Sequence, residues 1–241
     1  MVSLRLKALS SLEALVFCFV SSATVAQELP FNFNHSSVLM EETTFIPQML
    51  PDNSIKELCP PEKDFPRTGD IIAQTSQSYQ SPFIISATGS LYTHLGLVVE
   101  RNEGVFVLEA SSTVRYTPFQ EWINRGVDKK YTLMRVLPEL SYVAEVAVVE
   151  AEKFLGKDYD VLFDPSDKKM YCSELVQKAY ERSGATLGKW EKFEGLLDLR
   201  NMALAREVKK RWGRVPESLS IVTPKSILES PLLYIVYSNF N

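Results

Sequence analysis

The chain is poor in the residues that bind metal ions or form disulfide bonds. Its 241 residues include only two histidines, His35 and His94, and three cysteines, Cys18, Cys59 and Cys172. No Cys-x-x-Cys or His-x-x-x-His spacing occurs among them, so the zinc sites that such spacings mark are not predicted. We therefore expect no metal ion and no other cofactor.

Strong net charge and long apolar runs are also lacking. The net charge is −4 and no extended Lys/Arg-rich run is present, which argues against a nucleic-acid partner. Beyond the N-terminal leader, no stretch approaches the roughly 18 apolar residues that span a bilayer. Internal repeats and low-complexity tracts are absent from the sequence. The composition, 45% hydrophobic and 23% charged, is that of a globular protein with one substantial domain.

The N-terminus has the order of a secretory signal peptide. Basic first residues precede an apolar run at 14–20 and then a stretch of small residues. This order predicts a signal peptide over residues 1–26, cleaved after Ala26 or Ala23. The protein would then be periplasmic or secreted, with no membrane span after cleavage. Glu13 shortens the apolar run, so an uncleaved membrane-surface or buried helix is the alternative.

Residues 27–66 are polar and interrupted by prolines, and we interpret them as an N-terminal extension. His35 lies in this segment, where we expect it to be solvated. The organised domain is predicted over 67–241. Once the leader is removed, Cys59 and Cys172 remain, and in an oxidising compartment the two could form a disulfide bond.

Turn residues and apolar runs predict short strands and helices within this domain. Because strands and helices occur in separate runs, the predicted class is α+β, with a mostly antiparallel sheet packed against helices. Thr117 and Ser141 are expected to cap the helices that they begin. Strands are predicted at 71–73, 92–100, 105–110, 131–137 and 232–237. Helices are predicted within 76–90, bounded by Pro82 and Gly89, at 117–123, 141–155 and 172–183, over most of 184–213, and from 223.

Residues 170–176, Met-Tyr-Cys-Ser-Glu-Leu-Val, begin an amphipathic helix that Gly184 is placed to end. Cys172 is therefore in the first helical turn, where free backbone N–H groups and the helix dipole stabilise a thiolate. A thiolate is the form of cysteine that attacks a carbonyl carbon. The alternative is a small core residue, since free cysteine is among the most buried residue types.

A cysteine nucleophile needs a base within about 3 Å and a third group that fixes the tautomer of that base. His94 begins a predicted strand, and Glu109 lies at an apolar position on the strand predicted to pair with it. An acid in such a position needs a partner, which His94 would supply. The residues alone leave two alternatives open: a hydrogen-bonded core histidine, and a glutamate that points to water.

Short motifs in a shared order resemble the YiiX/YaeF-like family. These are circularly permuted papain-fold cysteine hydrolases, related to NlpC-type cell-wall peptidases and to lecithin–retinol acyltransferase. The resemblance spans residues 67–232, and its histidine precedes its cysteine, as in the permuted branch. The motifs are 69–72 (Gly-Asp-Ile-Ile), 94–98 (His-Leu-Gly-Leu-Val), 107–110 (Val-Leu-Glu-Ala), 117–119 (Thr-Pro-Phe), 156–160 (Gly-Lys-Asp-Tyr-Asp) and 171–176 (Tyr-Cys-Ser-Glu-Leu-Val).

The resemblance implies that Cys172 is the nucleophile, His94 the general base and acid, and Glu109 the group that orients His94. Backbone N–H groups at the start of the cysteine helix would help to stabilise the oxyanion. Tyr92 and Tyr171 flank this site in sequence, and we expect them to pack rather than react. The implied activity is that of a cysteine amidase or peptidase that needs no cofactor. It would act on peptidoglycan fragments or other short peptides.

Two alternatives to this activity remain open. One is a lipid thioesterase or acyltransferase of the same fold, acting on an acyl or lipid substrate. The other is a binding protein that keeps the fold without catalysis.

Overall fold

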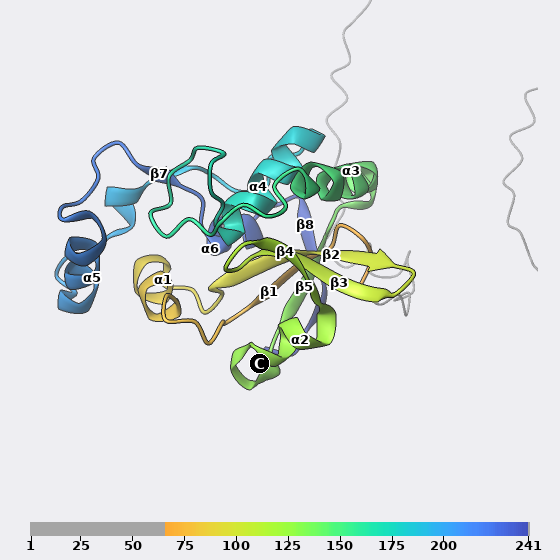
Figure 1. The fold of residues 1–241 in the computed structure, drawn as a ribbon, viewed down its shortest axis with the longest axis horizontal. Helices are drawn as coiled ribbons and strands as arrows, with labels where there is room; N and C mark the ends of the chain where they lie inside the picture. The colour runs from red at the N-terminus through yellow and green to blue at the C-terminus, as the bar shows by residue number, and fades with distance from the viewer. Residues whose placement is uncertain (1–65, 241) are drawn as a thin grey trace, which may run out of the picture. The chain divides into compact units, whose positions relative to one another are not determined.

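The computed structural model describes residues 66–240 (Figure 1). The signal peptide predicted over 1–26 lies outside these residues, as does all but the last residue of the extension predicted over 27–66. Both therefore stay predictions, as does the extent of the domain predicted over 67–241. None of the helices in the described part is long and apolar enough to cross a membrane.

A six-stranded sheet forms the framework, with the strand order β4-β3-β2-β1-β5-β8. Every neighbouring pair in this sheet is antiparallel, which confirms the predicted α+β class with its antiparallel sheet. A separate ribbon pairs β6 with β7. The strands are β1 Ile71–Gln74, β2 His94–Arg101, β3 Gly104–Ala110, β4 Val114–Pro118, β5 Thr132–Val136, β6 Glu191–Lys192, β7 Ser220–Ile221 and β8 Leu233–Ser238.

Helices cover both faces of the sheet. Figure 1 shows α3 and α4 side by side over one face, and α2 against the other. The α-helices are α1 Ser81–Thr88, α2 Phe119–Asn124, α3 Ser141–Glu152, α4 Cys172–Ser183, α5 Met202–Trp212 and α6 Pro224–Leu228, and the short 3-10 helices are η1 Val127–Lys129, η2 Pro138–Leu140 and η3 Phe193–Leu196.

The two faces of the sheet carry separate hydrophobic cores. Leu95 and Leu97 of β2 pack in the larger core with residues of α3 and α4. Val98 points to the opposite face and packs in the smaller core with Trp122 of α2. Because side chains alternate along a strand, His94 belongs to the same face as Val98. Burial on both faces explains why β2 reads as a nearly continuous apolar run.

An aromatic cluster joins α1 and α5 beyond the end of the sheet. The ring of Phe193 lies 4.9 Å from that of Trp212 and 6.5 Å from that of Phe83, measured between centroids. Phe163 lies 6.2 Å from Trp212 and 5.1 Å from Tyr171, the residue before α4. Tilted and edge-to-face contacts of this kind are favourable geometries for aromatic pairs. They connect α1 and α5 to the N-terminal end of α4.

Most of the predicted elements are confirmed. The strands β2 and β3 form the predicted hairpin, with Arg101 paired to Gly104. The helix predicted within 76–90 is α1, which has a proline in its first turn and Gly89 after its end. Gly184 ends α4 as predicted, in the left-handed conformation with φ 102°.

The predicted start of the helix at 117–123 was wrong. Thr117 and Pro118 are the last residues of a strand, β4, and α2 begins at Phe119. Thr117 does not cap the helix, because its hydroxyl donates a hydrogen bond to the carboxylate of Glu109, 2.6 Å away. A local capping signal was thus overridden by a contact with a neighbouring strand.

Two other helix predictions were only partly right. α3 begins at Ser141 without a hydrogen bond from that side chain to its first turn, and it ends at Glu152, before the predicted end. Of the segment 184–213, only α5 is an α-helix, and β6 and η3 precede it. The last turn of α5 is basic as predicted, and the guanidinium of Arg211 lies 4.8 Å from the centroid of the Phe83 ring.

Candidate active site

The three residues expected to carry the chemistry come together at one end of the sheet. Cys172 is the first residue of α4, His94 the first residue of β2, and Glu109 lies near the end of β3. α4 packs on one face of the sheet, whereas His94 and Glu109 belong to the face covered by α2. The side chains therefore meet where the two layers join at the strand ends.

Cys172 is a free cysteine and its residue surface is only 2% exposed. Its partner in the alternative disulfide, Cys59, lies outside the described residues. Tyr171, the residue before Cys172, has an extended backbone, and its N–H donates to the Glu174 carboxylate at 3.4 Å. Glu174 is itself buried and pairs with Lys178 one turn later, at 2.8 Å. These contacts fix the first turn of α4, where the helix dipole favours a negative charge on sulfur.

His94 is held between a carboxylate and an indole. Its Nε2 lies 2.5 Å from Glu109 Oε2, which leaves Nδ1 as the nitrogen available to the thiol of Cys172, the neighbour that contributes most to raising the pKa of His94. The imidazole stacks on the indole of Trp122, with ring centroids 5.8 Å apart and an interplanar angle of 23°. Position, tautomer and ring orientation are thus all specified by neighbours, as a catalytic base requires.

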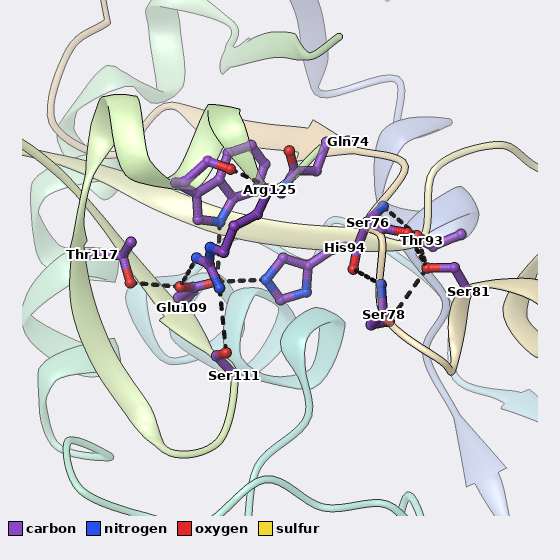
Figure 2. Close-up of polar contacts among 11 residues, drawn as sticks. Gln74, Ser76, Ser78, Ser81, Thr93, His94, Glu109, Ser111, Thr117 and Arg125 are labelled. Atoms are coloured by element: carbon purple, nitrogen blue, oxygen red, sulfur yellow. Dashed lines mark hydrogen bonds and ion pairs between the residues drawn. The ribbon is translucent and has the colours of Figure 1, made fainter. Parts of the chain in front are cut away.

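Glu109 is fully buried and receives hydrogen bonds from four side chains (Figure 2). Besides His94, its donors are the Thr117 hydroxyl at 2.6 Å, the Trp122 indole N–H at 3.0 Å, and Nη2 of Arg125. Figure 2 shows Thr117, Arg125 and His94 converging on this one carboxylate. The charge of Glu109 is compensated, as burial requires.

Burial alone would raise the pKa of Glu109, but His94, Arg125 and Thr117 lower that pKa to about 2. Burial likewise lowers the pKa of His94, yet its hydrogen bonds to Cys172 and Glu109 outweigh the loss of solvation and raise the pKa to about 10. Burial would raise the pKa of the Cys172 thiol, but His94 lowers it, helped by the backbone N–H groups of Leu95 and Ser173. At neutral pH these shifts favour a thiolate next to an imidazolium.

Tyr159 is a site residue to which sequence reasoning assigned no role. Its side chain hydrogen-bonds to Cys172, and burial together with that thiol raises the pKa of Tyr159 well above its usual value. The Tyr159 N–H donates to the carbonyl of Ser112 at 2.9 Å, which holds the loop before α4 against the turn after β3. The only signal for Tyr159 in the sequence is its place in the 156–160 motif.

The two tyrosines that flank the site in sequence have other partners. The hydroxyl of Tyr92 lies 2.8 Å from that of Thr132 on β5. The hydroxyl of Tyr171 accepts a hydrogen bond from the backbone N–H of Val222 at 3.1 Å. Both hydroxyl groups therefore have hydrogen-bond partners in neighbouring segments of the fold.

A cleft of about 620 Å³ lies on the His94 side of the site, and we call it the polar cleft because a substantial part of its lining is polar. Hydroxyl groups connect part of its wall: Thr93 Oγ1 lies 2.9 Å from Ser81 Oγ and accepts from the Ser76 N–H at 2.8 Å (Figure 2). These bonds tie the start of α1 to the residue before His94. Residues that line this polar cleft include Gln74, Ser78, Thr93, His94, Ser112 and Arg125.

A second, narrow space lies on the Cys172 side, with a free volume of about 30 Å³. We call it the apolar cavity because its accessible lining is almost wholly nonpolar. Ile84 and Tyr159 line both spaces and separate them. Other residues that line the apolar cavity include Phe83, Ala87, Phe163, Cys172, Phe193 and Val222.

A metal site would need several His, Cys, Asp or Glu side chains close together. Between residues 66 and 240, no group of three or more His, Cys, Asp or Glu side chains is arranged to hold a metal ion. Three or four such ligands are the usual minimum for a bound transition metal.

Comparisons with known proteins identify relatives of this chain. Residues 66–237 match the family described as "Permuted papain-like amidase enzyme, YaeF/YiiX, C92 family". The chain is 38% identical over 171 residues to "Uncharacterized protein YiiX" of Escherichia coli strain K12, covering 70% of this chain and 84% of that protein. It is 37% identical to a solved structure described as the metalloprotein yiiX from Escherichia coli O157:H7, DUF1105. That match has a TM-score of 0.67 and covers 73% of this chain and 99% of the other.

Proposed function

The chain belongs to the family of permuted papain-like amidases of the YaeF/YiiX type, and on that basis we propose that it hydrolyses an amide bond through a thioester on Cys172. The observation that carries the proposal is the position of the His94 imidazole, which is hydrogen-bonded to the buried Glu109 carboxylate and interacts electrostatically with the free Cys172 thiol. This is the arrangement of nucleophile, base and orienting acid that acyl transfer requires.

In the first step the Cys172 thiolate attacks the amide carbonyl carbon and forms a tetrahedral intermediate. His94, as imidazolium, gives its proton to the amide nitrogen, the C–N bond breaks, and the amine leaves a thioester on Cys172. Neutral His94 then takes a proton from water, which attacks the thioester and releases the acid and the thiolate. The sum is amide plus water to acid plus amine. Glu109 holds Nε2–H throughout and stabilises each imidazolium state.

Two kinds of donor are available for the oxyanion. Backbone N–H groups at the start of α4 lack partners within the helix and lie next to the reacting sulfur. The hydroxyl of Tyr159 faces that sulfur, and the oxyanion develops on the carbon that the sulfur attacks, so this hydroxyl is the second donor. We assign both to the oxyanion site.

Short peptides, including fragments of the cell wall, are the substrates that follow from the family resemblance. The apolar cavity beside Cys172 favours a second candidate, hydrolysis or transfer of an acyl group from a lipid or thioester. In both candidates, side chains and backbone groups of this chain carry every step. A periplasmic or secreted location rests on the predicted signal peptide, and N-terminal sequencing of the mature protein tests it.

Two experiments on the full-length protein test the catalytic assignment. Cys172→Ala is expected to abolish hydrolysis of any amide or ester substrate while leaving the unfolding transition in place. Substantial turnover by this variant, or a folded protein with no free thiol at Cys172, would overturn the proposal. A Cys59→Ser variant serves as the control and should keep full activity.

The second experiment measures the rate of Cys172 alkylation by iodoacetamide across pH, read by peptide mapping. Because the pKa of Cys172 is lowered, the thiolate should persist at pH values well below the free-thiol value of about 8.5. Hydrolysis should then fall in acid as the thiolate gains a proton. It should fall again near pH 10, where His94 loses the proton that the leaving group needs. An alkylation midpoint at or above 8.5 would mean that no activated pair exists.

A further inference from the structure

The two spaces at the site differ in chemistry as well as in size. The polar cleft is the more polar of the two: hydroxyl and amide groups share its lining with apolar side chains such as Val161, and among its lining residues His94 and Arg125 carry the charge. The apolar cavity has aromatic and aliphatic walls and almost no polar accessible surface. Tyr159 and Ile84 form the boundary between them, directly beside Cys172.

Proton transfer decides which part of a substrate lies in which space. The leaving nitrogen must receive its proton from His94, and His94 lines the polar cleft but not the apolar cavity. The acyl group, by contrast, stays bonded to Cys172, which lines the apolar cavity. A proton donor and its acceptor must approach to hydrogen-bond distance. The leaving amine therefore points into the polar cleft and the acyl substituent into the apolar cavity.

The walls of the apolar cavity limit what it can accept. Its free volume of about 30 Å³ is small beside the roughly 620 Å³ of the polar cleft. Phe193 packs against both Phe83 and Trp212, so the aromatic part of the wall is held in place from behind. A long chain would have to displace this cluster, whereas a small apolar group fits with minor side-chain movement.

We propose that the substrate is an amide with a short apolar acyl substituent, bound in the apolar cavity, and a polar leaving amine, bound in the polar cleft. The inference rests on the proposed function and names its substrate class. Ala87 on α1 and Leu196 of η3 set the length of the acyl group, since both line the apolar cavity and neither touches the polar cleft.

Alkyl chloromethyl ketones test the acyl side without requiring turnover. The Cys172 thiolate displaces chloride from the reagent, a C–S bond forms, and the alkyl group occupies the acyl position. We expect kinact/KI, normalised to the reaction with glutathione, to rise about fourfold for each methylene added. The rise should stop after two or three carbons. A reagent of equal length ending in a carboxylate should lose that gain.

Two matched variants show which of the two spaces holds the alkyl group. Ala87→Phe fills the apolar cavity and is expected to remove the dependence on alkyl length. Ser112→Phe, an increase in size on the polar side at a residue exposed to solvent, should leave that dependence intact. If Ala87→Phe does not fold, Leu196→Ala decides the question, because enlarging the apolar cavity should shift the optimum to longer chains.

The amine side is tested with acetyl amides of a hydroxylated amine and of an alkyl amine of equal length. The hydroxylated amide is expected to react faster, and Ser112→Phe should reduce its advantage. Inactivation that is independent of alkyl length, or a length preference that Ser112→Phe removes and Ala87→Phe does not, would overturn this inference but leave the proposed function standing. Failure of every reagent to label Cys172 would refute both.

Discussion

The two sides of the active site are built on different principles. On the α2 face, His94 and Glu109 lie in a closed polar network in which all four hydrogen bonds to Glu109 come from side chains. On the α4 face, the Cys172 thiol meets His94 and Tyr159 on one side and the apolar cavity on the other. The polar side fixes where the proton is, so it needs many directional bonds. The apolar side leaves space for an acyl group, so its walls are nonpolar.

This contrast teaches that acid–base geometry and substrate choice are separable in this protein. A change in the polar network should affect every substrate alike, because each reaction uses the same proton. A change in the wall of the apolar cavity should affect substrates according to their acyl group. Tyr159 belongs to neither class, since it borders both spaces and contacts the nucleophile.

The largest effect expected from a residue at this boundary is that of Tyr159→Phe. If the hydroxyl holds the oxyanion, kcat should fall on the order of 100-fold, as when one oxyanion donor is removed elsewhere. Alkylation by iodoacetamide forms no oxyanion and should change far less. Measuring both rates on the same protein separates the roles. Equal losses in hydrolysis and alkylation would mean that Tyr159 supports only the thiolate.

Glu109→Gln tests the polar side. Without the carboxylate, the pKa of His94 should fall from about 10 and the pKa of Cys172 should rise, so alkylation at pH 7 should slow. The loss of a charged acceptor for buried donors should lower the free energy of unfolding by about 2 kcal/mol, measured by urea titration. Glu152→Gln is the control, because Glu152 accepts from Tyr116 and Arg101 near the surface and should cost less than about 1 kcal/mol.

The pH dependence of that stability difference has a definite sign. The pKa of Glu109 is about 2 in the folded protein and about 4.3 in an unfolded chain. Its contribution to stability is therefore complete above about pH 4.3 and is lost as the pH falls toward 2. The difference between the wild type and Glu109→Gln should shrink across that window. A constant difference would mean that the carboxylate is not stabilised by its partners.

The sequence was sufficient where the signals are local. The hairpin of β2 and β3 was predicted because two apolar runs flank a turn, and α4 because its apolar spacing ends at Gly184. The fold class followed from the grouping of these elements. The structure also brings Cys172, His94 and Glu109 together, although their catalytic roles stay predictions.

What the sequence could not indicate depends on contacts between distant segments. The hydrogen bonds from Trp122 and Arg125 to Glu109 require α2 to lie across the end of β3, and no local pattern specifies that path. The residues around Thr117 indicate a helix cap, whereas its hydroxyl in fact donates to Glu109 on the neighbouring strand. The apolar cavity is formed by α1, η3 and the residues before α6, whose assembly is visible only in three dimensions.

Gly96 offers the finest test, because it determines how closely β3 approaches β2 on the polar side. A Cβ atom at Gly96 would lie 2.3 Å from Val107 Cγ1 and 3.4 Å from the Cβ of Glu109. Gly96→Ala should therefore push β3 away, lower the free energy of unfolding by about 1 to 3 kcal/mol, and lengthen the contact between Glu109 and His94. Gly195→Ala is the matched control, since no atom lies within 4 Å of its added Cβ and its effect should stay within about 0.5 kcal/mol. Slower alkylation of Cys172 at every alkyl length, with the length preference unchanged, is the expected signature of damage to the polar side alone. A changed preference would instead mean that the two sides of the site are mechanically coupled through β2.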